Sequence, residues 1–137
     1  MPESPGTPED LVDLAFTLAV RDVDDTGGPL IPFVLMEGPE GRALHRIMNG
    51  GDQDVDLELA VQQARWVVSQ SQSPRAAIAW DGYLTDELGR LDALYVEVFD
   101  RGMTTSACFA LRYAISNPGT MAVIGGPERL PGRPSII

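Results

Sequence analysis

Residues 76–124 have the sequence AAIAWDGYLTDELGRLDALYVEVFDRGMTTSACFALRYAISNPGTMAVI, which divides into four runs rich in apolar and aromatic side chains. Turns that contain Gly89, Gly102 and Gly119 separate the runs. The pattern predicts strands over residues 76–84, 90–99, 103–115 and 120–124. Because the connections are short, we expect these strands to form a four-stranded antiparallel meander.

The middle connection of this meander, Asp100-Arg101-Gly102, is typical of a three-residue hairpin loop that ends in a left-handed glycine. Such a loop would pair Phe99 with Met103, and it would leave both faces of the hairpin substantially apolar. A sheet with one solvated face should instead alternate apolar and polar residues. We therefore expect the second face to meet a partner subunit, to be covered by the N-terminal hairpin, or to form a ligand pocket.

The N-terminal half predicts a helix and a hairpin. Thr7 can cap a helix that begins at Pro8 and runs to about Val20. Its apolar residues recur at helical spacing and should face the core: Leu11, Leu14, Ala15, Leu18 and Ala19. Residues 30–36 and 42–48 are expected to pair as a hairpin, and Pro32, which lacks an N–H donor, suggests that the first of these strands lies at a sheet edge.

A second helix should begin near Asp54 or Asp56 and end at Ser73-Pro74. Its expected buried stripe comprises Leu57, Ala60, Val61, Ala64, Val67 and Val68. The predicted fold is therefore α+β, an antiparallel β-sheet of about four to six strands with two helices in the order α-β-β-α-β-β-β-β. We expect a flexible N-terminus over residues 1–6, a single domain over 7–124 and an extended or disordered tail over 125–137.

Composition limits the function classes. The chain has 137 residues and a net charge of −10, and residues 1–60 hold thirteen acidic residues against three arginines. A nucleic-acid backbone would be repelled by such a surface, so we expect no nucleic-acid partner. The charge either keeps a small protein soluble or attracts a basic partner.

The absence of lysine, with abundant Ala, Gly, Pro and Asp, is typical of a GC-rich bacterial genome. No apolar run approaches the roughly 20 residues of a membrane span, and Met1-Pro2-Glu3 does not begin a signal peptide. We expect a cytoplasmic protein without a membrane partner. Cys108 is the only cysteine, which excludes an intrachain disulfide.

Candidate binding residues come from the strands, and they are Asp81, Tyr83, Tyr95, Glu97, Phe109 and Arg112. Glu97 shares a strand face with Tyr95 among apolar neighbours, where burial would raise its pKa and suit it to acid–base chemistry. It could instead pair with an arginine such as Arg112 or Arg90, or be a structural or edge-exposed glutamate. A five-residue turn after residue 84 would put Asp81 and Tyr83 on the Glu97 face.

No motif indicates a catalytic residue, a metal site or a cofactor. The acidic clusters at residues 22–28 and 52–58 lack the glutamate that closes a calcium-binding loop. His45 is the only histidine, and Cys108 should be a small buried residue within a strand. The glycine pairs match neither a phosphate loop nor a dinucleotide-binding motif.

In the outline of its elements and its acidity, the chain resembles small acidic bacterial partner-binding proteins such as secretion chaperones and toxin-neutralising proteins. No single motif carries this resemblance. We expect a non-enzymatic protein-interaction module that binds another protein and forms a homodimer. The acidic charge would suit a basic partner. The alternative is a small-molecule-binding protein or hydrolytic enzyme with a carboxylate and tyrosine pocket on the sheet face.

Overall fold

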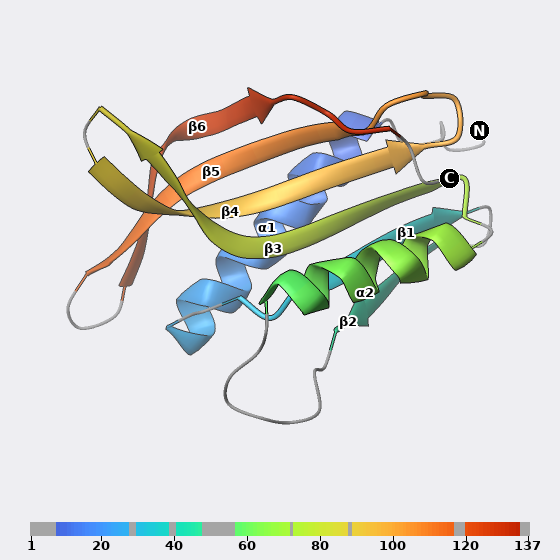
Figure 1. The fold of residues 1–137 in the computed structure, drawn as a ribbon. Coiled ribbons are helices and arrows are strands. Elements are labelled where there is room, and N and C mark those ends of the chain that lie inside the picture. Colours follow the sequence, from blue (N-terminus) through green and yellow to red (C-terminus); the bar gives the residue numbers. More distant parts are fainter. Residues whose placement is uncertain are drawn as a thin grey trace, which may run out of the picture.

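A computed structural model describes residues 8–27, 30–38, 41–47, 57–71, 73–87, 89–116 and 120–134 (Figure 1). Its elements are α1 (Pro8–Thr26), β1 (Phe33–Gly38), β2 (Gly41–Arg46), α2 (Leu57–Gln70), β3 (Arg75–Asp86), β4 (Gly89–Asp100), β5 (Ala107–Ser116) and β6 (Thr120–Leu130). The strands form one antiparallel sheet in the order β2-β1-β3-β4-β5-β6. The predicted α+β class and element order are confirmed.

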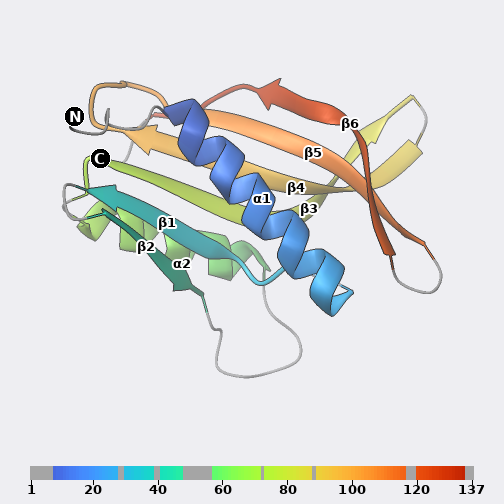
Figure 2. The same cartoon turned by 180° about the vertical axis from the view of Figure 1, so that it is seen from behind.

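Helix α1 packs on one face of the sheet, against β3 and β4 (Figure 2). The predicted stripe is confirmed, since Leu11, Ala15 and Ala19 are fully buried. The helix continues past the predicted end at Val20 because Val23 repeats the spacing one turn later and is also fully buried. Gly27 then ends it with a φ of 79°, and its N–H donates to the Val23 carbonyl.

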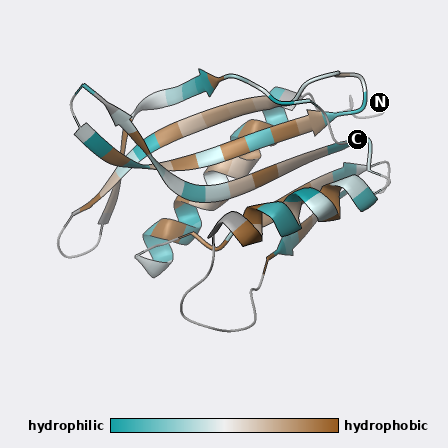
Figure 3. Cartoon of the chain, viewed as in Figure 1, coloured by the Kyte–Doolittle hydropathy of each residue, from teal (hydrophilic) through white to brown (hydrophobic). Residues whose placement is uncertain are grey.

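Helix α2 packs on the opposite face, against β1 and β3 (Figures 1 and 2). Ala60, Ala64 and Val68 are its fully buried residues, as the sequence predicts, and they contact Val34 and Ile78 within a second apolar core. The two faces of the sheet thus carry separate cores, and apolar residues run through the middle of the strands (Figure 3).

The N-terminal hairpin joins the sheet instead of covering it. β1 lies between β2 and β3, so the prediction that this strand is an edge strand is wrong. Pro32 precedes β1, and its carbonyl accepts a hydrogen bond from the Ile47 N–H. Its lack of a backbone N–H therefore removes no hydrogen bond between β1 and its neighbouring strands. The strand of this hairpin that lies at a sheet edge is β2, in which every residue is exposed.

The C-terminal meander β3-β4-β5-β6 is confirmed, but its register is not the predicted one. Val98 pairs with Ala107, so the predicted pairing of Phe99 with Met103 is wrong. The turn itself forms, since the Met103 N–H donates to the Asp100 carbonyl, but β5 begins only at Ala107. β6 also continues beyond the predicted end at residue 124.

Candidate functional site

The six candidate residues lie on two different faces of the sheet. Cross-strand pairing puts Asp81, Tyr83 and Phe109 on the α1 face, and Tyr95, Glu97 and Arg112 on the α2 face. The expectation that Asp81, Tyr83 and Phe109 share a face with Glu97 is therefore wrong. The physical reason is loop length, because Asp86 pairs with Gly89 across a two-residue turn and the loop after Phe99 is longer than three residues.

Glu97 is the centre of a buried ion-pair network that joins four parts of the chain. Its side chain is 0% exposed. Arg65 of α2 donates from Nη1 to Oε1 at 2.7 Å, and Arg133 donates from Nη2 to Oε1 at 2.7 Å and from Nε to Oε2 at 3.2 Å. The Ser106 hydroxyl donates to Oε2 at 2.6 Å. We call these four residues the Glu97 network.

This network explains why Glu97 is tolerated in the interior. A buried carboxylate is stable only when charges and hydrogen bonds compensate its lost hydration. Both oxygens of Glu97 accept from cations or a hydroxyl, so the group is not available as a general base. The partners are Arg65 and Arg133, and not Arg112 or Arg90 as the sequence suggested.

Asp81 belongs to a second buried polar group, on the α1 face. The Tyr113 hydroxyl lies 2.8 Å from both carboxylate oxygens, and the Leu30 N–H donates to Oδ2 at 2.9 Å. Burial raises the pKa of Asp81, and burial together with the Asp81 carboxylate raises the pKa of Tyr113. The group ties the segment before β1 to β3 and β5, which is a structural task.

Tyr95 stacks on Trp80 across the α2 face, with ring centroids 5.4 Å apart and planes at 6°. Its hydroxyl donates to the Tyr83 carbonyl at 2.7 Å, and burial raises its pKa. Gly82 lies under the ring, where an added Cβ would come within 3.0 Å of the tyrosine Cε2. Tyr83 itself turns to the α1 face, where the Arg90 guanidinium lies 3.6 Å from its ring centroid.

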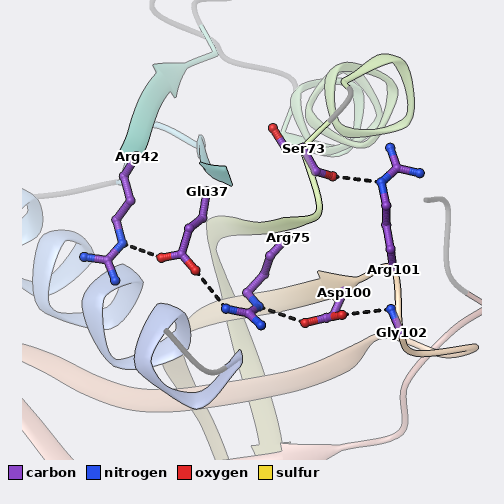
Figure 4. Close-up of polar contacts among 7 residues, drawn as sticks. All are labelled: Glu37, Arg42, Ser73, Arg75, Asp100, Arg101 and Gly102. Atoms are coloured by element: carbon purple, nitrogen blue, oxygen red, sulfur yellow. Dashed lines mark hydrogen bonds and ion pairs between the residues drawn. The ribbon is translucent and has the colours of Figure 1, made fainter. Parts of the chain in front are cut away.

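Charged side chains also close the end of the sheet near the β1-β2 turn (Figure 4). Glu37 accepts from Arg42 at 2.6 Å and from Arg75 at 2.8 Å, and Arg75 donates onward to Asp100 at 2.8 Å. A hydrogen bond from the Gly102 N–H and the Arg75 guanidinium lower the pKa of Asp100. The sequence pattern gave no signal for this chain of ion pairs, because its members come from β1, β2, β3 and the end of β4.

The structure also gives the positions of Cys108 and of the acidic clusters, which are the residue types that often act as nucleophiles or bind metal ions. Cys108 is buried, which raises the pKa of its thiol to about 11. Among the residues that the structure describes, no three His, Cys, Asp or Glu side chains gather as they would around a metal ion. Asp22 of the first acidic cluster pairs with Arg46, and residues 52–56 of the second cluster lie outside the described residues.

The outward surface of α2 was missed by the sequence analysis. It consists of Leu59, Gln62, Gln63, Trp66, Ser69 and Gln70, all exposed, and we call it the α2 outer face. Trp66 is 65% exposed and Leu59 is 45% exposed. These two residues are seven apart and so lie one above the other on the helix. The available signal was the scarcity of charge, since Arg65 is the only charged residue between Leu59 and Gln70.

No protein-family model, curated protein or solved structure matches this chain. Neither helix in the described part of the chain has the length and apolarity that crossing a membrane requires.

Proposed function

We propose that this chain is a non-enzymatic protein-interaction module that binds its partner through the α2 outer face. The single observation that carries the proposal is the exposure of Trp66, at 65%, on the α2 outer face, whose six described side chains are all uncharged. Tryptophan is among the residues most enriched at binding hot spots, whereas charged residues are depleted from the centres of interfaces.

The lack of charged side chains on the α2 outer face is unusual for a helix surface that faces solvent. A solvent-facing helix surface normally carries charged side chains opposite its apolar stripe. In α2 the one cation, Arg65, turns toward the sheet and pairs with Glu97. The other described side chains of the α2 outer face, besides Trp66 and Leu59, are glutamines and a serine. Such a surface can be covered by a partner without removing an ion from water.

The rest of the molecule favours a partner with a basic periphery. Helix α1 exposes five acidic residues against one arginine, and these are Glu9, Asp10, Asp13, Asp24 and Asp25, with Arg21. Charge of one sign outside an apolar contact speeds the encounter with a partner of opposite sign more than it strengthens the complex. The partner we propose therefore offers an apolar pocket for Trp66 and carries net positive charge.

The enzyme and ligand-pocket alternative has less support. Its carboxylates, Asp81 and Glu97, lie on opposite faces of the sheet, and each already accepts hydrogen bonds from its own chain. We retain the bacterial cytoplasm as the proposed setting on the strength of composition alone.

The proposal also includes a homodimer, on a surface separate from α2. The α1 face carries three exposed apolar or aromatic side chains near the C-terminal ends of β3 and β5 and the start of β6. They are Tyr83, Ile115 and Val123. β6 is an edge strand whose residues 120–124 include no charge, although edge strands are usually protected by charged residues or proline. Light scattering after gel filtration should give twice the chain mass of 14.8 kDa, and a monomer at every concentration would remove the dimer.

Photocrosslinking from the α2 outer face tests the partner-binding proposal. A photoreactive amino acid at Gln63 should form an adduct with one protein in the cells that produce this chain. The same amino acid at Thr17, exposed on α1, is the matched control and should not give that adduct. The adduct should disappear in a Trp66→Ala background. No adduct from position 63, or an adduct indifferent to Trp66, would contradict the proposal.

A further inference from the structure

The segment at residues 131–134, which follows β6, is attached to the sheet by a small set of specific contacts. The Ser106 N–H donates to the Arg133 carbonyl at 2.7 Å, and the Arg133 N–H donates to the Ser106 hydroxyl at 3.1 Å. Thr105 and Pro134 form an isolated antiparallel bridge. The backbone of this segment is thus paired with residues 105–106 like a short added strand.

The side chain of Arg133 completes these contacts in a specific geometry. Its guanidinium contacts both oxygens of Glu97, through Nη2 to Oε1 and Nε to Oε2. Two parallel bonds of this kind distinguish arginine from lysine, which offers only a point charge. Gly132 is required before it, because a Cβ at that position would lie 1.9 Å from the Ser106 carbonyl oxygen.

The contrast in burial indicates which side of the contact is preformed. Glu97 is 0% exposed, whereas the Arg133 side chain is 50% exposed and residues 131–134 are all exposed. Release of the segment would therefore uncover little apolar surface. Glu97 would keep Arg65 and Ser106 as partners, so the carboxylate would stay in position.

From this geometry we infer that Glu97 and Ser106 form a binding site for the guanidinium of an extended peptide with arginine after glycine, and that Arg133 occupies the site in the free chain. Arg133 thus acts as an internal competitor of an incoming segment. The site is separate from the α2 outer face, although Arg65 connects Glu97 to the helix that carries Trp66. The two proposals can therefore fail independently.

A full-length Arg133→Ala variant tests the site directly, with circular dichroism to establish that it is folded. The probe is the blocked peptide Pro-Gly-Arg-Pro, which copies residues 131–134, and the control peptide carries citrulline, an uncharged analogue of arginine. The arginine peptide should bind the variant at least about tenfold more tightly than the citrulline peptide, because hydrogen bonds to charged groups are the stronger ones. It should bind the wild-type chain and the Glu97→Gln/Arg133→Ala double variant much more weakly. Equal binding of the two peptides, or none to the single variant, would overturn the inference.

Hydrogen exchange on the wild-type chain gives a test that needs no variant. The Ser106 N–H, which is bonded to the Arg133 carbonyl, should exchange by local opening, far faster than the amides of Val96 and Val98 in β4. Excess Pro-Gly-Arg-Pro should compete with the internal segment and change the signals of residues 132–134. If Ser106 exchanges only when the whole chain unfolds, residues 131–134 are a fixed part of the fold and the inferred site does not exist.

Discussion

Replacing Glu97 by glutamine should be among the most destabilising single changes in this chain. Glutamine keeps the shape of the side chain but removes its charge and turns an N–H donor toward Arg65 or Arg133. Removal of one partner from a buried ion pair costs about 3–5 kcal/mol. Arg65 and Arg133 are 20% and 50% exposed and can recover part of their hydration, so we expect a loss of about 2–4 kcal/mol.

Urea unfolding at neutral pH, followed by circular dichroism, measures this loss as a change in the free energy of unfolding. The matched control is Glu128→Gln, since Glu128 pairs with Arg112 but is 45% exposed. The control should lose less than about 1 kcal/mol, as exposed ion pairs contribute little. If Glu97→Gln and the control lose the same small amount, the argument that the Glu97 network holds β4, α2 and the C-terminal segment together is refuted.

Three further changes test other parts of the structure. Because burial raises the pKa of Asp81 above its usual 3.8, its stabilising contribution is complete below pH 3.8 and is lost as the pH rises through the folded-state pKa. In urea unfolding, wild type should therefore lose stability relative to Asp81→Asn as the pH rises above about 4, and a pH-independent difference between the two would contradict this. Gly82→Ala should cost about 1–3 kcal/mol because its Cβ meets the Tyr95 ring, whereas Gly126→Ala, with open space at its Cβ, should change stability by less than about 0.5 kcal/mol; equal effects would remove the steric explanation. Cys108 should react with a thiol reagent much more slowly in the native chain than in urea, and rapid native labelling would show that the thiol is not buried as described.

The parts of the fold that depend on local pattern could be predicted from the sequence. The buried stripes of α1 and α2 follow from helical spacing, and the meander follows from short glycine-containing turns. The β4-β5 register could not be predicted from local pattern, because the residue just before β5 makes contacts with residues distant in the sequence. Ser106 bonds to Glu97 and to the backbone of Arg133, and β5 starts only after it.

For the candidate site too, contacts between residues distant in the sequence could not be predicted. The sequence marks Glu97 as the unusual residue of its strand, since a carboxylate among apolar neighbours must be compensated. Its cations are 32 and 36 residues away in the chain, and no local spacing predicts them. The observed register differs from the predicted one by three residues, since Cys108 and not Thr105 lies opposite Glu97. Because this number is odd, every side chain of β5 lies on the other face, which separates Phe109 from Glu97. The role we propose for Trp66 could not be predicted from the sequence, because it depends on the inward orientation of Arg65, which the structure shows.

The most direct test of the account is the affinity of the crosslinked partner for purified chains, measured by titration calorimetry. A truncated hot-spot residue typically costs at least about 2 kcal/mol, so Trp66→Ala should weaken binding by about 30-fold or more. Leu44→Ala removes another exposed apolar side chain, on the opposite face of the sheet, and should leave the affinity within about twofold. Equal affinities for the wild type and Trp66→Ala would contradict the claim that this chain binds its partner through α2.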